Sequence, residues 1–472
     1  MMDRSFVVSV ACVLALSSNF LRAADGDLAA IRSEMQLMRE AYESRIAALE
    51  SEVKAFKQSG VAQPKSVERS IIDSLFKKDG TTPPPDYSRL SVSTVSAVKG
   101  STQITLGGYT EFTYTDRTTR TPEFEQLKTV AEVSAKIDDR IHLYLEVEQE
   151  NGGVIAGPEP TNGEFEIEQA YLDYAIDKAL NFRAGVSLIP VGHYNLYHEG
   201  FLNNLVDRPL VDRRIIPTTW YEAGLGFNGT PVDNDSMGLS YEAYMYNPEK
   251  GNGVDPLSGF RGIRNENKTP NSDQKAGAAR LAFELARGFK NVADTLEFGL
   301  SGYVSGFAGF NSANAGGDLV RFPSGRLYVS AADVTWEKKN LGFRGEAARA
   351  HSDAGENSVG KQQTGWGYYA EGYYKFWPQF LSSSPFGKFK DPKLVAALRY
   401  DYVDLNTQAD ATPSIQRLTA GMGYRPIPRT VFKFDYQFDL LGSGLVGHDY
   451  DESETGLKKH TRAFLFSVTT GF

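Results

Sequence analysis

The chain has 472 residues, a formal net charge of -9 and no strong apolar bias. This acidic balance argues against a basic nucleic-acid-binding face, and we expect no nucleic-acid partner. A mean hydropathy of -0.36 excludes a protein built from membrane-spanning helices, each of which needs ~20 apolar residues. The length is compatible with two or three ordinary domains, or with one large barrel and an appendage.

Residues 1–23 have the features of a signal peptide. Arg4 supplies the positive start, Phe6–Leu16 is the apolar segment, and the expected cleavage follows Ala23. An N-terminal core helix is the alternative interpretation. Because Cys12 is the single cysteine, the exported chain is expected to have no disulfide, no thiolate nucleophile and no cysteine metal site.

Residues 24–58 have the apolar spacing of a coiled coil, interrupted by one four-residue step after Tyr42. The apolar positions are Leu28, Ile31, Met35, Met38, Tyr42, Ile46, Leu49, Val53 and Phe56. We expect a helix that associates with other copies, and a single amphipathic helix lying on the barrel is the alternative. Residues 59–102 are expected to form a linker with a short helix over 67–78, started by Ser66.

From Ile104 onward the apolar period changes from helical to two, as a strand requires. Sixteen such segments begin near Ile104, Leu127, Ile141, Ala170, Phe182, Ala223, Leu239, Ala279, Leu296, Ser330, Leu341, Trp366, Leu394, Arg417, Phe432 and Arg462. Short turns alternate with long connections, which is the pattern of outer-membrane barrels. The sequence therefore predicts an all-β fold over 103–472, a transmembrane antiparallel barrel of about 16 strands preceded by the coiled coil.

The polar faces of these strands carry many charged side chains, among them Glu146, Arg344 and Asp401, which suits a watery lumen better than a soluble surface. Aromatic residues gather toward strand ends, as in the interfacial belts of membrane proteins. The last segment ends on Phe472, and a terminal Phe closing such a strand resembles the signal read by the outer-membrane assembly machinery. We therefore expect a bacterial outer-membrane location, with membrane lipid and that machinery as partners.

A barrel of this size leaves a channel, so selectivity depends on what narrows it. The segment from Ile189 to Trp220 is the best candidate: it is charged and aromatic, with too few regular apolar residues to form a core. The candidate constriction and anion-binding residues are Arg183, His193, Tyr194, Arg208, Arg213, Arg214, Arg399 and Arg417. The alternative is that the three loop arginines after Asp207 pair with Asp207, Asp212 and Glu199 and only hold the loop.

The chain resembles the phosphate-selective porin O and P family over 104–472. The runs that carry this likeness are Gln169–Leu172, Phe182–Gly192, Asp207–Pro209, Tyr221–Gly226 and Gly471-Phe472. The resemblance implies a homotrimer of about sixteen-stranded barrels, with the third long loop folded into each pore. Anion selectivity needs clustered donors. Because acidic residues accompany the arginines, the sequence favours a general anion- or solute-permeable pore over a dedicated phosphate channel.

No other motif indicates chemistry, and we expect no enzyme activity, cofactor or bound metal. The Gly224–Gly229 run spells a nucleotide-binding pattern, but Thr230–Asp233 offers a turn where a helix is required. His193 and His198, with Glu199, give only a weak metal-site hypothesis. No GxSxG elbow is present. The alternative function is a structural or adhesive barrel that reaches peptidoglycan through its coiled coil.

Overall fold

A computed structural model describes residues 95–99, 102–118, 121–151, 163–249, 259–265, 274–307, 311–313, 319–321, 325–353, 362–445 and 459–472. The chain divides into two units, Met1–Asp79 and Gly80–Phe472, and every described residue belongs to the second. The predicted signal peptide, the coiled coil over 24–58 and the short helix over 67–78 lie outside the described residues.

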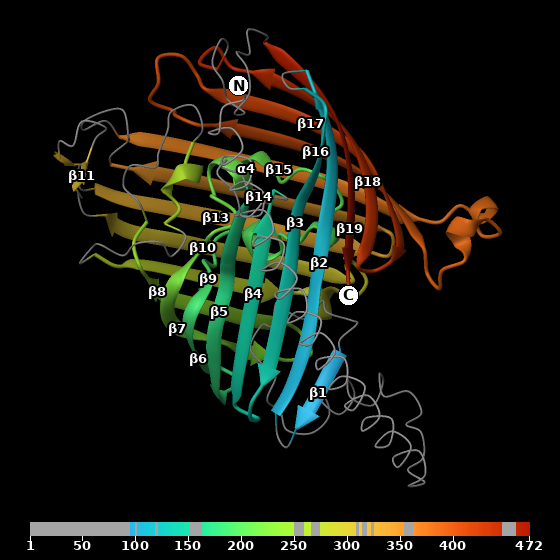
Figure 1. The fold of residues 1–472 in the computed structure, drawn as a ribbon, viewed down its shortest axis with the longest axis horizontal. Helices are drawn as coiled ribbons and strands as arrows, with labels where there is room; N and C mark the ends of the chain where they lie inside the picture. The colour runs from blue at the N-terminus through green and yellow to red at the C-terminus, as the bar shows by residue number, and fades with distance from the viewer. Residues whose placement is uncertain are drawn as a thin grey trace, which may run out of the picture. The chain divides into compact units, whose positions relative to one another are not determined.

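Sixteen antiparallel strands close into a barrel, as the sequence predicted (Figure 1). They are β2 (Thr102–Arg117), β3 (Glu123–Lys136), β4 (Ile141–Glu150), β5 (Glu164–Asp177), β6 (Leu180–Leu188), β7 (Tyr221–Asp233), β8 (Gly238–Tyr246), β9 (Ala276–Glu284), β10 (Thr295–Phe307), β13 (Gly325–Lys338), β14 (Leu341–Ser352), β15 (Gln363–Phe376), β16 (Lys393–Asp404), β17 (Ser414–Ile427), β18 (Thr430–Leu441) and β19 (His460–Gly471). Strand β1 (Val95–Lys99) pairs with the beginning of β2, and β11 (Asn311–Ala313) pairs with β12 (Leu319–Arg321).

The barrel closes where the last strand meets the first. Strand β19 pairs with β2 in a register that places Gly471 opposite Tyr109 and Ala463 opposite Arg117. The two strands lie side by side in Figure 1, one red and one blue. The prediction that the terminal strand closes against the one containing Ile104 is therefore confirmed, and closure leaves no unpaired edge between these strands.

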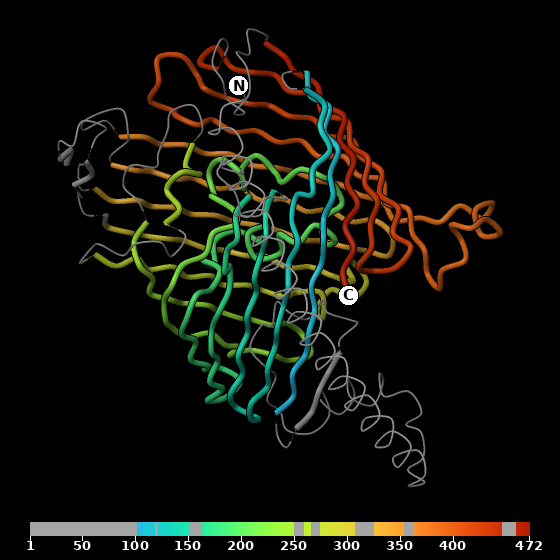
Figure 2. The backbone as a smooth tube through the Cα atoms, viewed as in Figure 1, coloured from blue at the N-terminus to red at the C-terminus, as the bar shows by residue number. Residues whose placement is uncertain are grey.

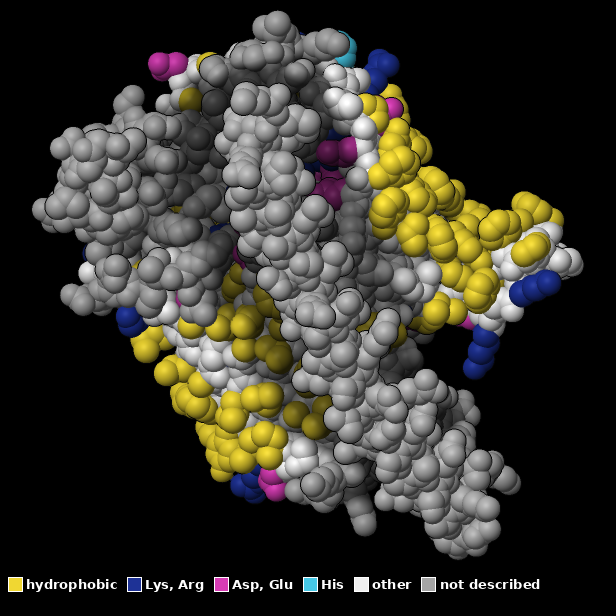
Figure 3. Space-filling view, in the orientation of Figure 1, with side chains coloured by type: hydrophobic (Ala, Val, Ile, Leu, Met, Phe, Trp, Pro, Cys, Tyr) yellow, Lys and Arg dark blue, Asp and Glu magenta, His cyan; other side chains and the backbone are white. Residues whose placement is uncertain are grey.

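The two faces of the wall differ in polarity. On β19, Phe464 is exposed on the outer face, whereas Thr461 and Ser467 are buried on the inner face. Figure 3 shows hydrophobic side chains gathered over the outer faces of several strands. This apolar-out, polar-in arrangement is that of a barrel surrounded by lipid. Among the described residues, no helix has the length and apolar character needed to cross a membrane.

Two connections depart from the expected alternation of long loops and short turns, and both lie on the short-turn rim. Residues 285–294 join β9 to β10 and contain the 3-10 turn η4 (Ala286–Phe289). Residues 377–392 join β15 to β16 and contain two 3-10 turns, η5 (Gln379–Leu381) and η6 (Pro385–Gly387). The connection over 377–392 projects from the barrel at the right of Figure 1 and exposes Phe380 and Phe386. The sequence did not predict it, because its aromatic residues resemble the end of a strand.

The long connection between β6 and β7 folds into the barrel (Figure 2). It contains α3 (His193–Leu196), the 3-10 turn η2 (Gly200–Leu202) and α4 (Leu210–Arg214). Helix α4 packs against β14, β15 and β16, and η2 contacts β19. We call residues 189–220 the constriction loop.

Candidate functional site: the constriction loop and the inner wall

The first part of the constriction loop is held by carboxylates that project from the wall. The Glu346 carboxylate accepts hydrogen bonds from the backbone N–H groups of His193 (3.0 Å) and Tyr194 (3.3 Å). Gly192 precedes them with a φ of 78°, and a Cβ there would lie 2.2 Å from the same carboxylate. Only glycine fits both the backbone angle and this close approach, which explains the Pro-Val-Gly run that ends the strand segment.

Further carboxylates repeat this arrangement along the loop. Asp401 accepts from the Leu210 N–H at 2.9 Å, and Asp435 accepts from the Val206 N–H at 2.6 Å. An irregular loop inside a barrel has backbone groups that no ladder satisfies, and each would be costly if left unpaired. The wall carboxylates supply the missing acceptors.

Wall cations bind the carbonyl groups of the same stretch. Lys433, fully buried on β18, donates to the carbonyls of Gly200 (3.0 Å) and Leu205 (3.2 Å). Arg399 donates to the carbonyl of Asp207 at 3.0 Å. Wall carboxylates thus bind N–H groups of the loop backbone, and wall cations bind its carbonyl groups.

Asp207 lies at the centre of an ion-pair network. Its Oδ2 atom is 2.8 Å from the Arg117 guanidinium and 3.2 Å from that of Arg417, which also forms a two-pronged bond with Asp439 at 2.8 Å. Burial opposes ionisation of Asp207, but Arg117, Arg417 and Arg213 together hold its pKa well below the usual value. The network joins β2, β17 and β18 to the middle of the loop.

The second part of the loop is held by apolar packing, which corrects our expectation that this segment cannot form a core. Val211, Ile215, Ile216 and Trp220 are fully buried and join a cluster with apolar residues of the inner wall. The Trp220 ring lies 4.6 Å from that of Tyr303. The apolar residues are spaced irregularly because the loop follows a curved surface, so no strand or helix period reveals them.

Burial shifts the pKa of two titratable groups of the loop toward their neutral forms. Burial, together with Arg280 and Arg344, lowers the pKa of His193 to about 3 despite the opposing charge of Asp333. Burial and the nearby Glu346 raise the pKa of Asp212 well above its usual value, although Arg399 opposes the shift. His193 therefore contributes no positive charge to the pore at neutral pH.

The eight predicted site residues fall into three groups. Tyr194, Arg208, Arg399 and Arg417 come together at the loop, where Arg208 donates to the Thr218 carbonyl at 2.7 Å. Arg213 and Arg214 lie on α4, the first half-buried and the second buried. Arg183 and His193 are the remaining two and lie against other wall residues. Arg183 bonds Asp173 at 2.7 and 2.8 Å and lies over the Tyr171 ring. His193 lies 3.9 Å from Asp333. The sequence suggested that Asp207 pairs with the loop arginines, but its ion-pair partners are Arg117 and Arg417 of the wall.

Sequence reasoning missed several residues that hold the loop: Arg117, Lys433, Arg425 and Asp435. Each lies on the polar face of its strand, so the alternation of side chains marks it as inward-facing. Nothing in the sequence distinguishes an inward charge that binds the loop from one that faces water, because the binding partners are distant in the chain. The Arg117 partner, Asp207, is 90 residues away, and the Arg425 partner, the Asn203 carbonyl, is 222 residues away.

The two loop histidines do not converge on a metal site. His198 faces Glu168 at 3.3 Å and contacts the Asn195 carbonyl at 3.1 Å, while His193 lies near Asp333 and Glu297. Arg280 already bonds Asp333 at 2.6 and 2.9 Å. The hypothesis of a site formed by His193, His198 and Glu199 is not supported by this geometry.

Comparisons with known proteins agree with the barrel. No protein-family model matches the sequence. An uncharacterised protein of Aquifex aeolicus is 26% identical over 356 residues, covering 71% of this chain and 75% of the relative. An anion-selective porin from Comamonas acidovorans superposes with a TM-score of 0.51 at 10% identity, covering 79% of this chain and all of that one. The outer membrane protein OmpT of Vibrio cholerae superposes with a TM-score of 0.49 at 11% identity, covering 80% of this chain and 99% of that one. The superposition on the Comamonas protein shows that the chain has the fold of an outer-membrane porin barrel.

Proposed function

We propose that this protein is a porin of the bacterial outer membrane, through which small hydrophilic solutes diffuse passively. The observation that carries the proposal is the constriction loop itself: a closed barrel with an apolar exterior holds a charged loop inside by bonds to its own wall. A loop fixed in this way narrows the water path without needing a moving part. The fold shared with a solved anion-selective porin supports the same class of function.

The charges around the loop favour a weakly selective pore over a dedicated phosphate channel. Arg183, Arg399 and Arg417 each bond a carboxylate, so little of their charge is free to attract an anion. Arg208 and Arg213, both half-buried, are the cations best placed to act on a passing solute. We propose that anions, phosphate among them, pass as members of a broad class of small solutes.

We further propose that the protein acts as a homotrimer in outer-membrane lipid and is inserted by the barrel assembly machinery through Phe472. This terminal residue is exposed and follows the last strand, where Arg429 binds its carbonyl at 2.7 Å. The alternative of an adhesive barrel that reaches peptidoglycan depends on the coiled coil, which lies outside the described residues.

Recording from the refolded protein in a planar bilayer tests the proposal. We expect steady, ohmic, step-like conductance, with steps in groups of three. A membrane that stays closed would contradict porin function. In the same assay, Arg213→Ala with Arg214→Ala should move the reversal potential toward cation preference, and an unchanged potential would favour a purely loop-holding role for these arginines.

A further inference from the structure

The constriction loop brings a histidine against two carboxylates of the inner wall. Ligand atoms of Glu146 on β4, Glu168 on β5 and His198 on the loop all lie within 4.8 Å of one another. All three residues are buried. Carboxylate oxygens and an imidazole nitrogen at this spacing are the ligand set of a divalent transition metal. The trio differs from the one that the sequence suggested, because both of its carboxylates come from the wall.

The His198 ring is oriented as a metal ligand is. Its Nδ1 atom lies 3.1 Å from the carbonyl oxygen of Asn195, which can only accept, so Nδ1 carries the proton of this bond. In the neutral ring, Nε2 then presents a lone pair, and it faces the Glu168 carboxylate at 3.3 Å. Two acceptors at this distance repel each other unless a positive charge lies between them, either a second ring proton or a cation. Metal-bound histidines commonly donate their other N–H to a backbone carbonyl in this way.

A β-bulge in β5 turns the second carboxylate toward the loop. The register shifts between Glu146 and Val147 of β4, which leaves Glu168 as an extra residue on β5. A regular strand would point Glu168 and Gln169 to opposite faces, but both are buried on the inner side. Gln169 donates to the Glu146 carboxylate at 2.5 Å, and this bond orients the other wall ligand. Bulges re-aim side chains in this manner beside functional sites.

Among the described residues, no lysine or arginine forms an ion pair with either wall carboxylate of the trio. Lys128, the buried cation of the neighbouring strand β3, bonds both oxygens of Glu148 at 3.0 Å. Arg208, which interacts with Glu168 over a longer range, bonds a loop carbonyl. One divalent cation balances the two carboxylates around a neutral His198.

Two further polar atoms beside the trio are buried without a hydrogen-bond partner in the described part of the chain. They are the hydroxyl of Tyr109 on β2, a residue 1% exposed, and the Oε2 atom of Glu199 on the loop. The Tyr109 hydroxyl interacts electrostatically with the carboxylates of Glu146, Glu168 and Glu199, which places it at the site. A buried polar atom without a partner is costly. A cation with one bound water gives both atoms a partner, since the water can donate to the carboxylate and accept from the hydroxyl.

The geometry favours zinc over calcium or magnesium. Two ligands ~2.0–2.1 Å from a tetrahedral zinc ion lie ~3.3 Å apart, which is the separation of His198 Nε2 from Glu168 Oε2. Calcium and magnesium prefer sites built from oxygen atoms alone. The other described group of this composition surrounds His193, and there Arg280 already bonds Asp333 at 2.6 Å.

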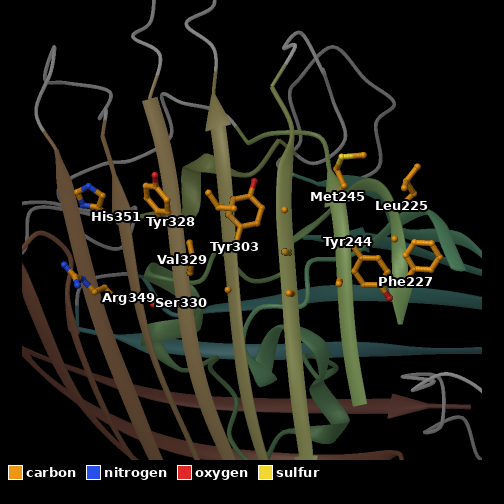
Figure 4. A pocket seen from close by; sticks show the side chains of 17 residues that line it. Leu225, Phe227, Tyr244, Met245, Tyr303, Tyr328, Val329, Ser330, Arg349 and His351 are labelled. Atoms are coloured by element: carbon orange, nitrogen blue, oxygen red, sulfur yellow. The ribbon is translucent and has the colours of Figure 1, made fainter. Parts of the chain in front are cut away.

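The histidine of β14 provides a contrast. His351 bonds Thr364 at 2.7 Å and lies 3.3 Å from Asp353. Figure 4 shows it with Arg349 among the residues that line a groove of the wall, and none of the described lining residues carries a carboxylate. His351 therefore meets one carboxylate and not two, which makes it the matched control for His198.

We propose that Glu146, Glu168 and His198 bind a divalent transition metal, zinc in the first place, with a water as the fourth ligand. Because only His198 belongs to the loop, the ion joins the charged part of the constriction loop to β4 and β5. This metal site goes beyond the proposed channel function and does not depend on conductance.

Titration with zinc chloride tests the site. The protein, refolded in detergent without a histidine tag and treated with a chelator that is then removed, should bind one zinc ion per chain in isothermal titration calorimetry. His198→Gln and Glu168→Gln each remove one ligand at similar size, and each should weaken binding at least ~tenfold. His351→Gln should bind zinc as tightly as the unchanged protein. Heat-shifted gel mobility shows whether each variant is folded.

Cobalt substitution tests the geometry on the unchanged protein, so it does not depend on the folding of any variant. Tetrahedral cobalt(II) absorbs visible light much more strongly than octahedral cobalt(II). We expect strong visible bands that grow until one cobalt ion is bound per chain and disappear when zinc is added.

Three results would overturn the proposal. The first is that the unchanged protein binds no zinc, which would make His198 a protonated partner of Glu168. The second is equal zinc affinity in the ligand variants and in His351→Gln. The third is a weak, octahedral cobalt spectrum. Bilayer conductance of the unchanged protein in the presence of chelator, expected to persist, separates failure of this site from failure of the porin proposal.

Discussion

The two parts of the constriction loop are held to the wall by different forces. Residues 192–208 are bound by directed hydrogen bonds and ion pairs, such as those of Glu346 with α3 and of Lys433 with η2. Residues 209–220 are bound mainly by apolar burial, with Ile215, Ile216 and Trp220 fully enclosed. Directed bonds fix where the charged stretch lies in the pore, whereas burial supplies most of the energy that keeps the loop inside.

Substitutions in the two parts of the loop should therefore affect different properties, stability in one part and selectivity in the other. Changes in the apolar part should alter stability first, since a cavity costs the lost contacts as well as the transfer of the side chain. Changes in the polar part should alter selectivity first, because in the proposed porin its paired charges line the water path. The three predictions that follow compare the two parts, from the largest expected effect to the smallest.

Trp220→Ala should give the largest loss of stability. It empties a fully buried site beside Tyr303 and removes the donor to Glu249, whose carboxylate accepts from Trp220 Nε1 at 2.6 Å. We expect a loss of about 3–5 kcal/mol, measured from the urea midpoint of the folded, fast-migrating form. Trp366→Ala, on the exposed outer face of β15, should cost much less. Equal losses would refute the claim that burial of residues 209–220 holds the loop.

Asp207→Asn should change selectivity with a smaller loss of stability. It leaves Arg117 and Arg417 without their shared carboxylate and removes one negative charge from the pore. We expect the reversal potential to move toward anion preference, with a stability cost of roughly 1–3 kcal/mol. The control is Asp391→Asn, which breaks an exposed ion pair with Lys393 on the short-turn rim. It should change neither the reversal potential nor the stability. A reversal potential that does not move would place Asp207 outside the water path.

Glu249→Gln should remove part of the dependence of stability on pH. Burial and the nearby Glu222 raise the pKa of Glu249 to about 8, although the Trp220 and Asn265 donors oppose this. Because the folded state holds this proton and the unfolded state releases it near pH 4.5, stability falls as pH rises between these values, by at most about 1.4 kcal/mol per pH unit for one proton.

The measurement is the urea midpoint of the unchanged protein and of Glu249→Gln at several pH values between 5 and 9. The unchanged protein should lose stability relative to the variant up to about pH 8, and the difference should be constant above it. His193 acts in the opposite direction below its usual pKa, but it is present in both proteins and cancels. Parallel curves over the whole range would show that Glu249 is ionised in the folded protein.

The barrel was predictable because each strand sorts its side chains between lipid and lumen, as Phe464 and Ser467 do, and this leaves a period of two in the sequence. The constriction loop was predictable from its length and charge, although the strand that follows it near Ala223 has a weak pattern. Its attachment was not, because the decisive contacts join residues far apart, as Arg417 and Asp207 are by 210 positions.

The central claim is that the constriction loop lines the water path. Cys12 is the single cysteine and lies in the predicted signal peptide, so after the predicted cleavage Arg213→Cys would carry one thiol, on half-buried Arg213 of α4. Planar-bilayer current through this variant should fall in discrete steps, three for each proposed trimer, when a membrane-impermeant thiol reagent is added, while the unchanged protein does not respond. A current that persists unchanged after the thiol is shown to be modified would contradict the claim.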